Sequence, residues 1–143
     1  MIRPAEPRDL PAVLALLAEA NLPTEGVGDH LRSFFVADQG GRIVASAGLE
    51  VRGDAALLRS LAVAADVRGT GLGAAVLRRA LREADHRKDG VYALTTTAEQ
   101  YLSRFGFERV PRTSLPPELF ESRELQDACP ASATIMKRER GAR

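Results

Sequence analysis

The sequence has little of what several classes of protein require. It contains one cysteine, Cys129, which excludes an internal disulfide, and two histidines, His30 and His86, which with one cysteine give no metal-ligand spacing. We therefore expect no metal site. Twenty basic residues against nineteen acidic ones leave a net charge of +1, which argues against nucleic-acid binding. No apolar stretch approaches the ~20 residues that cross a bilayer, and no basic-then-apolar leader is present, so we expect a cytoplasmic protein without a membrane anchor.

The length and composition fit a single domain. The 143 residues are enough for one hydrophobic core and too few for two ordinary domains, so residues 1–143 are interpreted as one unit. Hydrophobic residues at 45% and charged residues at 27% are typical of globular proteins.

The first 63 residues predict one helix followed by antiparallel strands. Residues 2–4 are suited to a short strand, and Asp9 is suited to cap a helix whose apolar residues recur at positions 10, 13, 14 and 17. Two hairpins follow, because tight turns at 38–41 and 53–54 separate three predicted strands, at 34–37, 42–50 and 57–63.

The second half predicts a crossover and a mixed sheet. A helix over 71–87 between the strands 57–63 and 91–96 implies a right-handed connection and a parallel pair. A short helix over 98–105 closed by Gly106, then strands at 107–110 and 132–137, complete the pattern. We therefore predict an α+β fold, in which helices flank a mixed central sheet of antiparallel hairpins and one parallel pair.

The most informative motif is the glycine-rich turn Arg68-Gly69-Thr70-Gly71-Leu72-Gly73, which joins a strand to a helix. Such a turn leaves backbone amides unpaired at a helix start, and these amides can bind a diphosphate. The spacing is neither that of a Walker loop nor the G-x-G-x-x-G of dinucleotide-binding folds, and the turn follows antiparallel strands. The alternative is that the glycines serve only a tight turn and close packing.

These features resemble the GNAT superfamily of acyl-CoA-dependent N-acyltransferases, whose motif between a strand and a helix is Arg/Gln-x-x-Gly-x-Gly/Ala. Arg68, Gly71 and Gly73 match it, and Phe-Gly-Phe at 105–107 is a second match. More narrowly, the segments 48–50, 57–63, 95–99 and 129–133 look like the N-acetyltransferases associated with arsenic-resistance operons. This resemblance implies acetyl-CoA as cosubstrate and a small amino-acid-like amine as acceptor, including glutamate-like arsenicals. It leaves open whether the chain forms a homodimer.

The resemblance also implies two coenzyme-binding segments. The turn amides would hold the CoA diphosphate, and the backbone of the preceding strand would pair with the pantetheine arm where the two parallel strands splay apart. The residues concerned are Leu61, Ala62, Val63, Arg68, Gly69, Thr70, Gly71, Leu72, Gly73 and Ala74.

Acetyl transfer to nitrogen needs a neutral amine, a donor for the oxyanion and a proton for the departing thiolate. Backbone amides near Leu61 are suited to the second task. Glu50, expected at a strand end near the cleft, is the preferred base, with a water chain as the alternative. Many GNAT enzymes place a tyrosine four residues before the glycine that corresponds to Gly106. This chain has Leu102 there, and Tyr101 is displaced by one residue, or about 100° around a helix. Either Tyr101 or solvent would protonate the thiolate.

Substrate recognition is predicted from side chains near the expected cleft. Arg59 is suited to clamp a substrate carboxylate, and the hydroxyls of Thr95, Thr96 and Thr97 follow the next strand. Cys129 is interpreted as a structural thiol, so transfer is expected to be direct, in a ternary complex. Two alternatives stay open. The first is a degenerate acyl-CoA-binding or regulatory module without catalysis, which the missing tyrosine at Leu102 supports. The second is an acyltransferase for protein N-termini or lysines.

Overall fold

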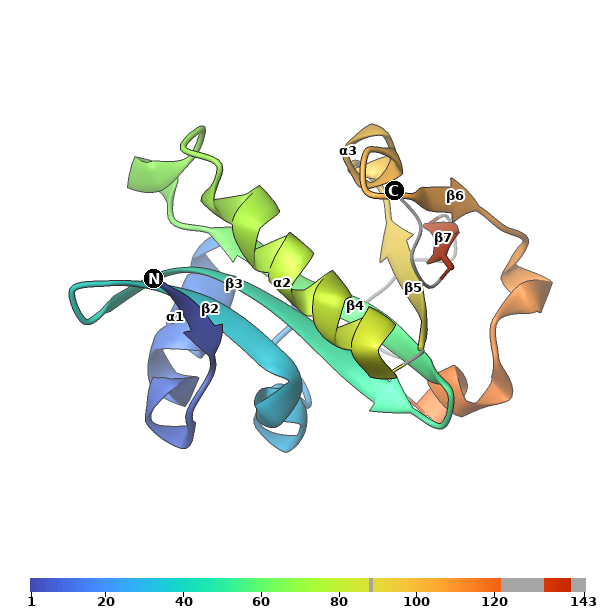
Figure 1. Cartoon of the computed structure of the whole chain (residues 1–143), viewed down its shortest axis with the longest axis horizontal. Coiled ribbons are helices and arrows are strands. Elements are labelled where there is room, and N and C mark those ends of the chain that lie inside the picture. The colour runs from blue at the N-terminus through green and yellow to red at the C-terminus, as the bar shows by residue number, and fades with distance from the viewer. Residues whose placement is uncertain (88, 122–132, 140–143) are drawn as a thin grey trace.

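The computed structural model describes residues 1–87, 89–121 and 133–139. Its strands form one mixed sheet in the order β1-β2-β3-β4-β5-β7-β6, in which β4 and β5 are the parallel pair (Figure 1). Every residue of β3 from Val44 to Glu50 is buried. Because successive strand residues point to opposite faces, both faces of the sheet are covered there, and α1 and α2 both pack against β3.

The first half follows the predicted order with longer strands. Asp9 directly precedes α1, but the prediction that it caps this helix is wrong, because its side chain makes no capping hydrogen bond there and its carboxylate accepts from the Glu6 amide instead. Each hairpin turn lies where the sequence places it. β3 runs to Arg52 and β4 begins at Ala55, so both extend two residues beyond the prediction, because their ends pair across a two-residue turn at 53–54. The elements are β1 (Ile2–Pro4), η1 (Pro7–Asp9), α1 (Leu10–Glu19), η2 (Gly28–Ser33), β2 (Phe34–Gln39), β3 (Arg42–Arg52) and β4 (Ala55–Val63).

The second half confirms the crossover. Helix α2 links β4 to β5, and these strands pair in parallel from Ala55↔Gly90 to Leu57↔Tyr92. The short helix α3 covers Glu99–Ser103 and so ends two residues earlier than predicted, and Gly106, with a φ of 91°, follows in the turn after it. The elements are η3 (Ala65–Val67), α2 (Leu72–Arg87), β5 (Gly90–Thr95), α3 (Glu99–Ser103), β6 (Phe107–Arg109), η4 (Arg112–Ser114), η5 (Pro117–Glu121) and β7 (Thr134–Arg138). Cys129 and residue 132 lie outside the described residues.

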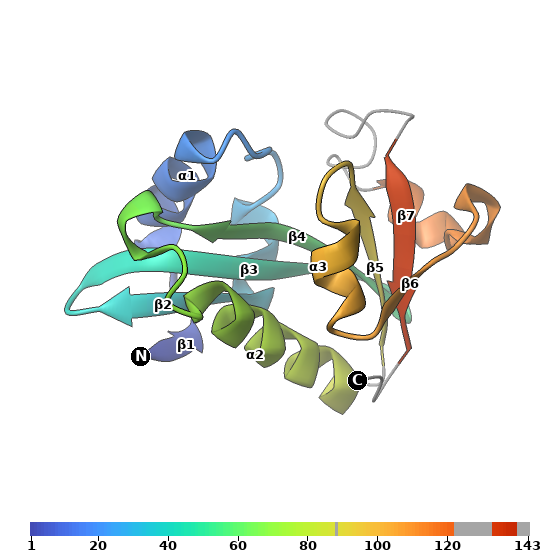
Figure 2. The same ribbon diagram turned by 90° about the horizontal axis from the view of Figure 1, so that it is seen from above.

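Two apolar clusters hold the sheet. The larger one joins α1 and α2 to the central strands, with Leu17, Phe34, Leu49 and Leu77 almost fully buried. A smaller one gathers Leu57 and Leu119 with other apolar side chains of β4, β5, β7 and the segment that precedes η5. Figure 2 shows β5, β7 and β6 turned away from β2, β3 and β4, so that the sheet opens between β4 and β5 beyond their paired ends.

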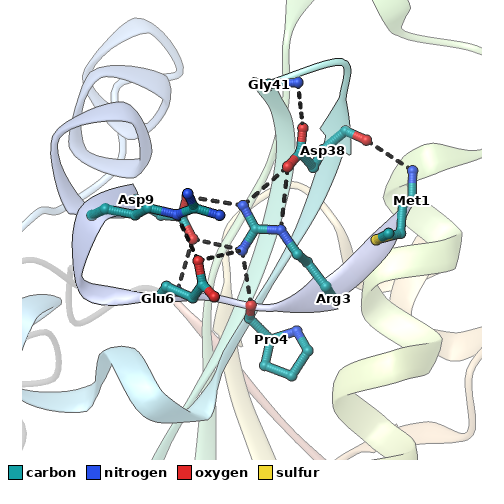
Figure 3. A network of polar contacts seen from close by, with 8 residues as sticks. Met1, Arg3, Pro4, Glu6, Asp9, Asp38 and Gly41 are labelled. Atoms are coloured by element: carbon teal, nitrogen blue, oxygen red, sulfur yellow. Dashed lines mark hydrogen bonds and ion pairs between the residues drawn. The ribbon is translucent and has the colours of Figure 1, made fainter.

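An arginine-centred network fastens the N-terminal strand (Figure 3). The Arg3 guanidinium donates to both carboxylate oxygens of Asp9, at 2.7 and 3.0 Å, and to Asp38 Oδ2 from Nε and Nη2 at 3.2 and 3.1 Å. Asp9 also accepts from the backbone amide of Glu6 at 2.7 Å. The Arg3 guanidinium beside it holds the pKa of the Asp9 carboxyl below its usual 3.8. The network therefore ties β1 to both α1 and β2.

Replacing Asp9 by Asn is expected to lower the free energy of unfolding at pH 7 by about 2 kcal/mol, because a buried, charge-assisted pair is lost. Since the folded pKa of Asp9 lies below 3.8, the pair stabilises the protein above that pH and is lost as the pH falls through the folded value. Urea unfolding across this range should show the wild type and the variant converging at acid pH. Glu108→Gln, at an exposed carboxylate on β6, is the control; a gap independent of pH would contradict the assignment.

Candidate active site

One extra residue in β4 distorts the sheet at its centre. Ser46 faces Ala62 and Gly48 faces Arg59, so Ala47 alone lies opposite Ser60 and Leu61. Ser60 takes a φ of 59°, which costs a non-glycine residue about 1–2 kcal/mol. The Ser46 hydroxyl donates to the Ser60 carbonyl at 2.7 Å and holds this bulge. A bulge leaves the extra residue out of the ladder and bends the strand.

The two parallel strands separate just before this bulge. Their register ends at Leu57↔Tyr92, although β4 continues to Val63 and β5 to Thr95. β5 stays paired with β7 from Val91 to Thr95, so the open edges are the ends of β4 and β5 that face each other. The predicted splayed pair is therefore present, and it places unpaired β4 backbone beside an opening.

The glycine-rich turn follows directly, and its amides are free. In the described part of the chain, no hydrogen bond leaves the backbone amides of residues 69–74, and the first helical bond is Ala75 N to Gly71 O at 3.0 Å. Gly69 and Gly71 have φ values of 82° and 86°, which L-residues rarely adopt. Successive free amides at the start of a sixteen-residue helix attract an anion.

A pocket of about 520 Å³ joins the turn to the open edge of β4. Nine of the ten predicted coenzyme residues line it; Thr70 does not, because its hydroxyl turns back to the Val67 carbonyl at 2.6 Å. Arg68 Nε donates to the Val63 carbonyl at 3.3 Å. Ala20, Leu22 and Val67 also line the pocket; they are ordinary apolar residues, so nothing in the sequence marks them as part of a site.

Tyr101, rather than Leu102, faces this pocket. Leu102 is buried in the core, whereas Tyr101 lines the pocket and packs on Phe105 with ring centroids 5.2 Å apart. A Cβ built on Gly73 would lie 3.7 Å from the Tyr101 hydroxyl and 3.0 Å from Val63 Cγ2. The one-residue displacement therefore still directs a phenol into the pocket, and a side chain at position 73 would close the space between them.

The predicted base and the predicted carboxylate clamp contact each other. Arg59 Nη1 lies 3.1 Å from Glu50 Oε1, and Arg52 Nε lies 2.8 Å from Glu50 Oε2. Glu50 is 1% exposed, and neither it nor Arg59 lines the pocket at the turn. The expectation that Glu50 ends its strand is wrong, because β3 continues to Arg52 and the pairing with β4 covers it. The Glu50–Arg59 pair joins strands β3 and β4 just before the bulge.

His30 lies at the solvent side of this cluster. Its Nε2 is 3.7 Å from Glu50 Oε2, and its side chain is 21% exposed. Burial lowers the pKa of His30 from 6.5, partly opposed by the Glu50 carboxylate. Arg59 Nη1 and His30 Cδ2 lie 3.5 and 4.0 Å from a Cβ built on Gly26, so the loop between α1 and η2 borders the cluster.

The three threonines at the end of β5 have different surroundings. Thr95 Oγ1 accepts from the amides of Thr97 and Ala98, at 3.2 and 2.7 Å, and so orients the start of α3. Thr96 and Thr97 are exposed, and none of the three lines the pocket at the turn.

Free amides at a helix start, beside a splayed parallel pair with a bulged strand, are the arrangement that the sequence resemblance predicts for an acyl-CoA-dependent transferase. The family model for the acetyltransferase (GNAT) domain matches residues 30–109, more than half of the chain. This protein belongs to that family of acetyltransferases, as the sequence motif predicted. No curated protein has a sequence that matches the chain.

Solved structures share the fold at low sequence identity. Rv2747 of Mycobacterium tuberculosis, solved with CoA and a second ligand, is 22% identical with a TM-score of 0.81, and the match covers 97% of this chain and 98% of that one. N-acetylglutamate synthase from Neisseria gonorrhoeae, solved with coenzyme A and N-acetyl-glutamate, is 21% identical with a TM-score of 0.82; the match covers 98% of this chain and 35% of that one. The ribosomal-protein-S18-alanine N-acetyltransferase of Escherichia coli is 22% identical with a TM-score of 0.68, and the match covers 98% and 93%.

Among the described helices, none has the length and apolar character needed to cross a membrane. Nor do the described residues bring three or more metal-ligating side chains of His, Cys, Asp or Glu together.

Gly71→Leu is expected to abolish CoA binding measured by calorimetry, because a side chain there would crowd the free amides. The matched control is Gly40→Leu. Both glycines have a positive φ and open space around a built Cβ, so both variants carry the same strain of about 1–2 kcal/mol, but Gly40 lies in the β2–β3 turn. Equal CoA affinity in the two variants would contradict the prediction that the turn amides bind the CoA diphosphate.

Proposed function

We propose that this protein is an acetyl-CoA-dependent N-acetyltransferase that acetylates the amine of a small amino-acid-like substrate, and that residues 1–143 act as one acyltransferase domain. The observation that carries the proposal is the single pocket that joins six free turn amides to the unpaired edge of a bulged strand. A similar structure was solved with coenzyme A and N-acetyl-glutamate, which supports an amino-acid-like acceptor. Glutamate-like arsenicals belong to this substrate class and follow from the arsenic-operon resemblance.

The pocket fits the coenzyme in shape and chemistry. The amides of residues 69–74 would hold the diphosphate, and the backbone of residues 61–63 would pair with the pantetheine arm as an added strand. Bound in this way, acetyl-CoA supplies the thioester that donates the acetyl group. Gly73 leaves room for the arm between Val63 and Tyr101, since a Cβ there would approach Val63 Cγ2 to 3.0 Å.

The reaction proposed is direct attack in a ternary complex. The amine nitrogen attacks the thioester carbonyl carbon, a C–N bond forms, and the C–S bond breaks to release the thiolate. The bulge at Ser60 and Leu61 takes this part of β4 out of its ladder, which suits the backbone amide near Leu61 to donate to the carbonyl oxygen as charge develops. Tyr101, whose side chain lines the pocket, is the proposed proton donor to the thiolate.

The amine must lose a proton before it attacks, and Glu50 is proposed to act in this step through His30. Glu50 itself is buried and held by two arginines, so protonating it would weaken two ion pairs. His30 is partly exposed, and its lowered pKa keeps it neutral at pH 7. A neutral imidazole can accept the proton, and the Glu50 carboxylate at 3.7 Å then stabilises the imidazolium.

The acceptor is proposed to bind beside this cluster, under the loop of residues 21–27. Arg59 reaches that loop, where its Nη2 lies 3.5 Å from the Pro23 carbonyl. A guanidinium at this position suits a substrate carboxylate. The exposed hydroxyls of Thr96 and Thr97 are proposed to border the same site from the end of β5, with Thr95 fixing their segment.

A panel of amino acids, glutamate analogues and their carboxamides tests this function, with release of free CoA thiol as the measurement. We expect turnover with amino acids and at least about tenfold lower kcat/KM with the carboxamides, because one charge-assisted contact is lost. Arg59→Gln should remove that preference, whereas Arg109→Gln, at an exposed β6 arginine paired with Glu99, should keep it. CoA binding without thiol release from any amine would instead identify a binding module.

A pH profile of kcat tests His30. Because its pKa lies below 6.5, the wild-type rate should hold on acidification to about that pH and fall once His30 becomes protonated. His30→Gln should lower kcat about a hundredfold and lose this acidic limb. The only other histidine, the exposed His86 at the end of α2, provides the control His86→Gln. An unchanged acidic limb in His30→Gln would refute the role.

A further inference from the structure

The end of α1 supplies part of the wall of the pocket at the turn. Ala20 and Leu22 line this pocket together with Leu61, Ala62 and Val63 of β4. Leu22 is the larger of the two, and its half-buried side chain packs against the main apolar cluster. The space available inside the pocket therefore depends on where α1 ends and on which side chain follows it.

The cap of α1 fixes Leu22 in place. Asn21, the residue before it, takes a left-handed φ of 57°. The Leu22 amide donates to the Leu17 carbonyl at 2.9 Å, and the Asn21 amide donates to the Ala18 carbonyl at 3.1 Å. These are the two hydrogen bonds of the Schellman motif, which ends a helix on a left-handed residue and holds the next residue against the last turn. Leu22 is therefore a fixed part of the pocket wall, although it lies outside the helix.

Ala20 and Leu22 lie toward different ends of this pocket. Ala20 also borders a smaller cavity of about 120 Å³ with Arg68, so it lies toward the glycine turn. Leu22 directly precedes Pro23, whose carbonyl lies 3.5 Å from Arg59 Nη2. Leu22 therefore lies toward the acceptor site that is proposed beside Arg59.

The acyl group of the donor belongs at the same end. In the proposed reaction the backbone amide near Leu61 donates to the thioester carbonyl, and Leu61 lies just beyond Arg59 in β4. Leu22 and Leu61 both line the pocket, so an acyl chain attached to that carbonyl is bordered by apolar side chains from α1's end and from β4. Such a lining suits methyl and methylene groups rather than charge.

We propose that Leu22 makes the enzyme selective for acetyl over butyryl donors, because its side chain occupies the space that a longer acyl chain needs. The inference rests on the proposed function, since the coenzyme must lie in this pocket. Extra methylenes in a filled apolar site force side chains or backbone to move, which weakens binding. Leucine exceeds alanine by an isopropyl group and butyryl exceeds acetyl by an ethyl group, so Leu22→Ala makes room for the longer chain.

Calorimetric binding of acetyl-CoA and butyryl-CoA to the full chain tests the proposal. The wild type should bind butyryl-CoA about tenfold more weakly, whereas Leu22→Ala should bind the two equally or prefer butyryl-CoA. The control Leu14→Ala removes the same isopropyl group from a half-buried leucine of α1 that does not line the pocket, and it should keep the wild-type preference. Because the preference compares two ligands on one protein, a loss of stability common to both variants does not alter it.

Leu22→Phe makes the opposite change. It should weaken binding of acetyl-CoA about tenfold relative to CoA, which carries no acyl group. Equal wild-type affinity for acetyl-CoA and butyryl-CoA, or a preference that Leu22→Ala retains, would overturn the proposal while leaving the coenzyme site intact. A preference lost equally in Leu14→Ala, or a Leu22→Phe variant that weakens CoA and acetyl-CoA alike, would also overturn it. Absence of any CoA binding to the wild type would instead refute the proposed function.

Discussion

The bulge in β4 is the feature on which the rest of the site depends. Opposite Ala47, the strand holds both Ser60 and Leu61, and Ser60 adopts a left-handed backbone that the Ser46 hydroxyl supports. Beside this bulge the pairing of β4 with β5 has already ended at Leu57, so the β4 backbone that follows presents an open edge. In an undistorted sheet the open edge, the pocket beside it and the approach to the glycine turn would all be closed by β5.

Two charges are buried beside this bulge, on β3 and β4. Arg59 directly precedes the bulge, and its Nε donates to Ser60 Oγ at 3.2 Å while its Nη1 pairs with Glu50. Burying two charges costs more desolvation free energy than burying a pair of apolar side chains, so such a pair contributes little to stability. Its value at this place is positional: it links β3, the bulge and the loop at Pro23, which together border the proposed acceptor site.

Positive charge extends from the glycine turn along α2. The free amides lie at the start of this helix, and further along it a second pocket, of about 650 Å³, is lined by Arg78 and Arg82 of α2 together with Arg104 and Arg138. Between them Phe105 contributes to both sides, because it packs on Tyr101 and carries Arg78 on its ring. A single helix thereby positions both the free amides and the arginines Arg78 and Arg82. The net charge of the whole chain, +1, does not reveal this local concentration of positive charge.

The sequence by itself determined the order of the elements, the parallel pair, the family and the glycine turn, because hydrophobic periodicity, turn residues and a local motif are all written in consecutive residues. Nine of the ten residues that it assigned to the coenzyme line the pocket at the turn. Only the tertiary structure decided which polar side chains meet. Examples are the pairing of Glu50 with Arg59, the approach of His30 to Glu50, and the orientation of Tyr101, not Leu102, toward the pocket at the turn. The gathering of Arg78, Arg104 and Arg138 likewise joins residues far apart in sequence. Register, bulge position and helix rotation set those contacts, and each depends on packing across the whole sheet.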